Sequence, residues 1–177
     1  MGGRAVTHRL MRYLGSAAFG FRAEVRSIRH GLALLGREQT RRFVSLVALG
    51  EMGSDKPLEI LITAAARAKF CESLGADTGM ADRKADLFLM GALSLIDAML
   101  DQPMSTVVDE LPLSDDLKGA LQGEQGPLRP VLDFVECYER GDWATCDRLQ
   151  ETYGIDGPSV FGRYREAAAW ATAAWHR

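Results

Sequence analysis

The sequence predicts an all-α protein, a bundle of about nine helices. Apolar residues recur at intervals of three and four along most of the chain, the spacing of a buried helix face. No alternating, β-branched run long enough to predict a strand is present. With 177 residues, of which 47% are hydrophobic and 25% charged, the chain has the composition of a single globular domain over residues 1–177. A chain of this length can bury a core of its own.

The first half of the chain predicts four helices before its most apolar segment, at residues 5–14, 27–35, 38–49 and 58–74. Glycine and proline stand between them, as they do where helices end. The fourth of these segments is long and rich in alanine. Small side chains let another helix approach closely, so we expect this helix to pack against the segment that follows.

That segment, residues 87–100 (LFLMGALSLIDAML), predicts the central helix of the core. A helix this apolar is buried on most sides, and about 14 residues are too few for a bilayer, which needs roughly 20. Ser94, Asp97 and Asp101 follow the spacing i, i+3, i+7 and therefore predict one thin polar stripe along it.

The second half predicts shorter helices. Pro103 begins one at residues 104–111, and Ser114 is expected to cap the next. After the interruption GEQGP at 123–127, apolar stripes predict helices at 128–140 and 143–153, and a last helix begins near Pro158. Large side chains in the last two stripes are expected to face inward, among them Trp143, Tyr153, Phe161 and Trp175.

The charge is distributed unevenly. Residues 1–42 hold nine arginines against Glu24 and Glu38, a net charge of +7, whereas the rest of the chain holds 12 basic and 22 acidic residues, a net charge of −10. A solvated face is the simpler interpretation of the arginines, and contact with an acidic partner is the sharper one. The residues expected to meet such a partner are Arg22, Arg26, Arg29, Arg41 and Arg42. Nucleic acid is the less favoured partner, because the basic segment shows no clustered aromatics and no recognisable reading helix.

Motifs for catalysis or metal binding are lacking in the sequence. The three histidines, His8, His30 and His176, have no neighbour at the spacing of metal ligands, and no P-loop, dinucleotide fingerprint or nucleophile elbow is present. The three cysteines are widely spaced within apolar patterns, which indicates reduced core thiols of a cytoplasmic protein. No signal peptide and no segment of transmembrane length are found. These observations predict a protein without cofactor or metal that is not an enzyme.

Three stretches resemble the HDOD domain, the HD-related output domain of bacterial signalling proteins. The first is LMRYLGSAAFGFRAEVRSIRHGLALLGREQTRRFVSLVAL, the second KPLEILITAAARAKFCESLGA, and the third FLMGALSLIDAMLDQPMSTVVDELPLSDDLKGAL, which continues through RPVLDFVECYERGDW. The resemblance extends over residues 7–175. It implies an orthogonal bundle of HD-domain type and an association with EAL-type cyclic di-GMP phosphodiesterase modules. Because the opening helices of the family are not in this sequence, we expect a fragment or shortened form. Apolar surface around Leu10, Met11 and Leu14 would then be bared as a second partner site.

HD-type phosphohydrolases, which HDOD domains resemble, hold metal with a histidine on one helix and an adjacent His-Asp pair on the next. By this resemblance the upstream histidine falls near Thr63, and Ser94 and Leu95 stand in place of the His-Asp pair, with Asp97 close by. A leucine offers no lone pair to a metal, and a serine hydroxyl is a poor substitute for imidazole. The resemblance therefore implies altered metal positions and no catalysis by this scaffold.

The function that the resemblance implies is a non-catalytic signalling or protein-interaction module in cyclic di-GMP-linked regulation. Its partner would be another protein, a linked EAL-type module or a second copy in a homodimer, with no membrane involved. Two alternatives stay open: a degenerate HD-type phosphohydrolase that still binds nucleotide or metal, and a nucleic-acid-binding module that uses the basic first third.

Overall fold

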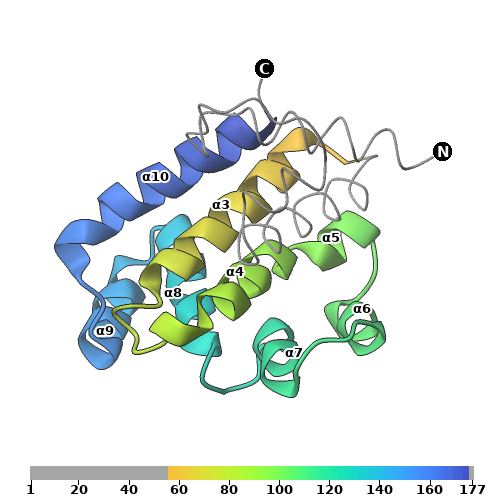
Figure 1. Ribbon diagram of the computed structural model, residues 1–177, viewed down its shortest axis with the longest axis horizontal. Coiled ribbons are helices and arrows are strands. Elements are labelled where there is room, and N and C mark those ends of the chain that lie inside the picture. Colours follow the sequence, from red (N-terminus) through yellow and green to blue (C-terminus); the bar gives the residue numbers. More distant parts are fainter. Residues whose placement is uncertain (1–55, 176–177) are drawn as a thin grey trace, which may run out of the picture.

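A computed structural model describes residues 56–175, and this part of the chain is all helical (Figure 1). It contains eight α-helices and one 3-10 turn. Their bounds are α3 (Leu58–Leu74), η1 (Ala81–Arg83), α4 (Lys84–Leu93), α5 (Ile96–Leu100), α6 (Met104–Glu110), α7 (Asp115–Gln122), α8 (Arg129–Arg140), α9 (Trp143–Tyr153) and α10 (Gly157–Trp175). No strand occurs within these residues, so the predicted all-α class is confirmed.

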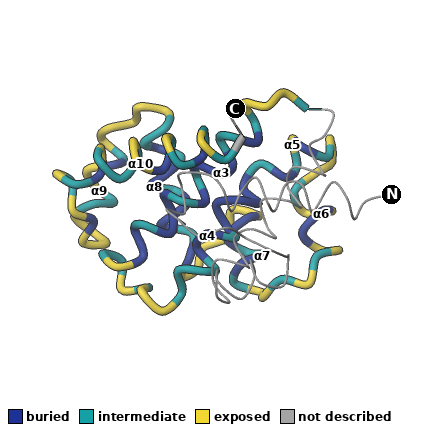
Figure 2. Tube along the Cα trace, turned by 45° about the horizontal axis from the view of Figure 1, so that its top comes forward, coloured by how far each residue is buried: buried dark blue, intermediate teal, exposed yellow. Residues whose placement is uncertain are grey.

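Helix α3 is the central element of the bundle. It packs most extensively on α4 along one side and on α10 along another, and α8 crosses it as well (Figure 1). Its bounds are those that the alanine-rich pattern predicts, and seven of its residues from Leu61 to Leu74 are buried apolar side chains besides Cys71. Figure 2 shows buried segments running through α3, α4 and α8, with exposed stretches on α9 and around α6 and α7.

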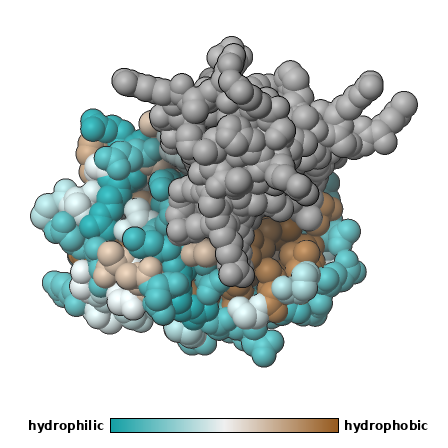
Figure 3. Space-filling model, viewed as in Figure 1, coloured by the Kyte–Doolittle hydropathy of each residue, from teal (hydrophilic) through white to brown (hydrophobic). Residues whose placement is uncertain are grey.

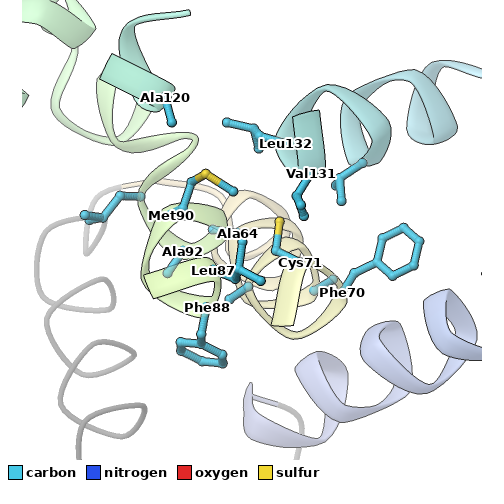
Figure 4. Close-up of a cluster of buried hydrophobic side chains, with 14 of the residues drawn as sticks. Ala64, Phe70, Cys71, Leu87, Phe88, Met90, Ala92, Ala120, Val131 and Leu132 are labelled. Atoms are coloured by element: carbon cyan, nitrogen blue, oxygen red, sulfur yellow. The ribbon is translucent and has the colours of Figure 1, made fainter. Parts of the chain in front are cut away.

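The core is assembled from side chains that come from distant parts of the sequence. Cys71 of α3 faces Val131 of α8, Phe70 precedes it on the same helix, and Met90 projects from α4 (Figure 4). All four of these side chains are completely or almost completely inaccessible to solvent. Burial of this kind contributes on the order of 25 cal/mol per Å² of apolar surface removed from water.

The expectation of one central helix over residues 87–100 is wrong. Helix α4 ends at Leu93 and α5 begins at Ile96. The carbonyl oxygen of Gly91 accepts the N–H of Ser94 at 3.3 Å and the Ser94 hydroxyl at 2.8 Å, which closes the last turn of α4. Leu95 then has φ −124° and ψ 17°, outside the helical region. The polar stripe predicted for Ser94, Asp97 and Asp101 is therefore not on one helix.

Gly91 permits the close approach of α3 and α4. A Cβ atom at this position would lie 2.5 Å from the backbone oxygen of Arg67 and 2.6 Å from the backbone nitrogen of Ala68. Real Cβ atoms essentially never come nearer than 3.0 Å to such atoms. The two helices can therefore keep their distance only while residue 91 is glycine.

Two further local expectations are corrected. Ser114 does not cap α7 with its side chain; its hydroxyl donates to Oδ1 of Asp116 at 2.6 Å instead. Trp143, Tyr153 and Phe161 are not inward: their exposed fractions are 59%, 39% and 66%. Helix α9 packs mainly on α8 and buries a single residue, so one side of its apolar stripe stays in solvent.

None of the helices in residues 56–175 is long and apolar enough to cross a membrane. On the face seen in Figure 3, apolar surface gathers toward the side of the molecule where Figure 1 places α5 and α6. The remaining described surface of this view is mostly hydrophilic.

Candidate functional site

Ser94 and Leu95, which the resemblance predicts to replace a metal-binding His-Asp pair, lie beside a charged network centred on Arg67. The guanidinium of Arg67, in the middle of α3, contacts both carboxylate oxygens of Glu139 on α8. Its Nε donates to Oε1 at 3.2 Å and to Oε2 at 2.9 Å, and one terminal nitrogen donates to Oε2 at 2.7 Å. Its other terminal nitrogen donates to Oγ of Ser94 at 3.2 Å. We call Arg67, Glu139 and Ser94 the Arg67 network. It ties α3, the end of α4 and α8 together through one side chain.

The network is largely shielded from water. The side chains of Arg67 and Glu139 keep 14% and 17% of their surface exposed, and Ser94 is buried. A bidentate contact of guanidinium with carboxylate is among the stronger polar interactions in proteins. Because both charges are mostly removed from water, loss of either partner would leave the other poorly compensated.

Ser94 and Leu95, which are predicted to replace the His-Asp pair, have structural contacts. The Ser94 hydroxyl donates to the carbonyl oxygen of Gly91 and accepts from Arg67, so its proton and one of its lone pairs are used within the protein. Leu95 is half-buried and packs against the core. The two positions form the break between α4 and α5.

Thr63 and Asp97 do not join this network through any described hydrogen bond. The Thr63 hydroxyl donates to the carbonyl oxygen of Glu59, one turn earlier in the same helix, at 2.8 Å. Asp97 lies in the first turn of α5 and is half-buried, and its backbone carbonyl accepts from Gln102. Thr63 is nevertheless one helical turn before Arg67, so both are on the same side of α3.

These positions do not fit a metal ion. The guanidinium of Arg67 brings a permanent positive charge to Ser94, and a cation placed there would be repelled. Within residues 56–175, no three His, Cys, Asp or Glu side chains are grouped so that they could hold a metal. What this arrangement can do is hold three helical segments in a fixed relation.

An aromatic cluster that includes Tyr164 lies close enough to Arg67 and Glu139 to feel their charges. Phe70, Tyr138 and Tyr164 pack edge-on or tilted with ring centroids 5.2 to 5.6 Å apart. Burial and the nearby Glu139 raise the pKa of Tyr164. Burial likewise raises the pKa of the Cys71 thiol, and this outweighs the opposing effect of Arg67 one turn away. Cys71 is therefore an inert thiol of the core, as the sequence predicts.

The sequence reasoning missed Arg67 and Glu139. Arg67 is the one arginine in an otherwise alanine-rich stretch of α3, which is a weak signal of a special environment. Glu139 comes directly after the apolar stripe of α8, and no sequence pattern around it indicates a special role. The two residues are also 72 positions apart. The five arginines expected to meet a partner, Arg22, Arg26, Arg29, Arg41 and Arg42, and the surface around Leu10, Met11 and Leu14, lie outside the described residues.

The helices of residues 56–175 form an all-α bundle of HD-like type. A match to the HDOD domain family covers residues 3–100. The chain therefore belongs to the HDOD family. No solved structure matches the chain significantly.

Two curated relatives align with nearly the whole chain. "Cyclic di-GMP phosphodiesterase CdgJ" of Vibrio cholerae is 33% identical over 167 residues, which are 94% of this chain and 39% of that protein. "Uncharacterized protein YuxH" of Bacillus subtilis is 29% identical over 169 residues, 94% of this chain and 41% of that protein. The chain thus spans about two fifths of the length of the relatives it matches.

The Vibrio relative overturns one expectation. The replacement of the metal positions by Ser94 and Leu95 predicts that the protein is not an enzyme, but this relative is named as a phosphodiesterase. Side chains at two altered positions of one domain are therefore not a sufficient basis for denying enzymatic function to the protein that contains it.

Proposed function

We propose that this chain is the HDOD part of a cyclic di-GMP phosphodiesterase and adjusts the activity of that enzyme through protein contacts. The observation that carries the proposal is the alignment of 94% of the chain with a relative named for this activity. That alignment covers 39% of the relative, which leaves room in such a protein for a further module. By the family resemblance, we propose a module of EAL type.

The Arg67 network supports a role in transmitting conformational state. Its three side chains come from α3, the end of α4 and α8, so a shift of one of these segments must break or move hydrogen bonds to the other two. Hydrogen bonds that join three segments in this way couple their positions, so that a movement of one is transmitted to the others. Contact of one part of the bundle with a linked module, or with a second copy, would then change the positions of all three segments.

The test is an assay of cyclic di-GMP hydrolysis by the complete protein encoded in the natural reading frame. We compare it with a version from which these 177 residues are deleted, and with the same deletion supplied with the purified chain as a separate molecule. We expect the deletion to change the hydrolysis rate several-fold and the added chain to restore it in part. Equal rates with and without the chain would contradict the proposal, and so would hydrolysis that resides wholly in the isolated chain.

A further inference from the structure

Two cysteines that the Arg67 network does not use lie in contact between α8 and α9. Cys137 is in the last turn of α8 and Cys146 is in the first turn of α9, and both are free thiols. Their Sγ atoms are 2.6 Å apart. Exposed fractions of 0% and 1% show that neither sulfur has more than marginal contact with solvent. The backbone thus brings the two sulfurs to within bonding reach.

The turn between the helices fixes this proximity. Gly141 has φ 70°, a left-handed conformation in which its N–H bonds to the carbonyl oxygen of Tyr138 at 3.1 Å. The N–H of Asp142 bonds to the carbonyl oxygen of Cys137 at 3.0 Å. The side chain of Asp142 then accepts the N–H of Thr145, which caps α9. The end of one helix and the start of the next are therefore both held by hydrogen bonds beside the cysteines.

Helix α9 is the element through which the pair can be reached. Cys146 is its only buried residue, and among the described elements the helix packs mainly on α8. An element with so few buried contacts opens locally at a small fraction of the cost of global unfolding. While α9 is closed, burial raises the pKa of Cys137 to about 12 and also raises that of Cys146, so both thiols stay protonated and unreactive.

We propose that Cys137 and Cys146 are a redox-active pair, which hydrogen peroxide converts to a disulfide that ties α8 to α9. When α9 opens, one thiol loses its proton, and its sulfur attacks a peroxide oxygen. The O–O bond breaks, hydroxide leaves and takes up the released proton as water, and a sulfenic acid remains. The second sulfur attacks the sulfenic sulfur, the S–O bond breaks, and a second water leaves. The two sulfurs lose two electrons, and the two peroxide oxygens gain them.

The disulfide would enclose Glu139, which lies between the two cysteines in the sequence and holds Arg67. It would also fix Trp143, whose ring packs on Tyr138 at a centroid distance of 5.5 Å and is 59% exposed. Oxidation would therefore make the Trp143 side of α9 rigid. This inference stands independently of the proposed function in cyclic di-GMP signalling.

The test treats the reduced 177-residue chain with hydrogen peroxide, blocks remaining thiols and maps the products by mass spectrometry after digestion with trypsin. Cleavage after Arg140 separates the two cysteines, so a disulfide appears as two linked peptides. We expect this linkage and the loss of two of the three free thiols. Linkage through Cys71, oxidation to sulfinic acid without linkage, or no reaction would each overturn the proposal. Because the product is mapped on the unaltered chain, the result does not depend on whether a variant folds.

Variants then identify the route. Cys137→Ala and Cys146→Ala should abolish the linkage, whereas Cys71→Ala, which removes an equally buried thiol, should retain it; far-UV circular dichroism establishes that each variant is folded. Asp142→Ala removes the cap of α9 and should speed disulfide formation several-fold relative to Glu151→Ala, an exposed substitution in the same helix. Equal rates for these two would overturn opening of α9 as the route of oxidation.

Discussion

Substituting alanine for Gly91 should destabilise the protein strongly, although alanine is the better helix former. The added Cβ would meet the backbone of α3 at 2.5 Å, which is 0.9 Å short of the 3.4 Å at which ordinary contact begins. Because the obstacle is backbone and not a flexible side chain, α4 must move away from α3 by about that amount. Overpacking of this kind costs typically about 1–3 kcal/mol and occasionally more. The helix propensity of alanine returns at most about 1 kcal/mol.

The chain offers a matched control in Gly162 of α10. A Cβ at Gly162 would meet nothing within 4 Å, so Gly162→Ala has the same effect on the unfolded chain without the clash. We expect Gly91→Ala to lower the free energy of unfolding by about 2 kcal/mol and Gly162→Ala to raise it by about 0.5–1 kcal/mol. Urea titrations followed by circular dichroism at the helix band measure both values.

The difference between the two variants is the decisive quantity, because it isolates the contact of α3 with α4. If Gly91→Ala proves as stable as Gly162→Ala, the two helices are not as close as the geometry shows, and the expected clash with the backbone of α3 does not occur. A lowered denaturant slope in Gly91→Ala alone would instead report a looser native state.

The remaining predictions concern charged groups. Arg67→Met and Glu139→Gln should each lower the free energy of unfolding by about 2–3 kcal/mol, between the small effect of exposed ion pairs and the larger one of buried pairs. In the same urea assay, the double variant should lose less than the sum of the two single losses. Strict additivity would show that the two residues are not coupled. Hydrogen bonding from Ser114 and the guanidinium of Arg83 hold the pKa of Asp116 below its ordinary value of 3.8. A lowered folded-state pKa stabilises the protein above the unfolded-state pKa, and this contribution is lost as the pH falls through the folded-state value. Asp116→Asn should therefore lose less unfolding free energy than the parent between about pH 5 and pH 2, and parallel pH profiles of the two proteins would contradict this.

In the described part of the chain, the sequence largely predicted which segments are helical and where each helix begins and ends. The bounds of α3 match the expected range of 58–74, and α9 covers the expected 143–153. Short-range rules suffice here, because glycine and proline limit each helix and the apolar period repeats every three to four residues. The break between α4 and α5 was not predictable in this way: the apolar run continues through it, and the interruption depends on how Ser94 bonds to Gly91.

The assignment of Ser94 and Leu95 to a former metal site stays a prediction, and the chemistry beside them could not be predicted from the sequence. Resemblance to the HD motif singled out Ser94 and Leu95, and these do lie at a junction of helices beside a charged group. It did not indicate Arg67 or Glu139, because nothing in the local pattern of either residue points to the other. Whether the altered positions deprive the protein of enzymatic activity was answered wrongly from the same two residues, since a relative carries a phosphodiesterase name.

The sequence by itself determined the helical class, the ends of most described helices and the family, because these depend on local spacing and on ordered motifs. The tertiary structure alone decided which side of each helix is buried and which charges meet. Trp143 and Phe161 belong to convincing apolar stripes, yet α9 and α10 leave them exposed, because burial requires a partner surface that periodicity does not supply. The pairing of Arg67 with Glu139 also depends on packing. Because α8 packs across α3, an arginine and a glutamate that are 72 residues apart in the sequence form one hydrogen-bonded pair.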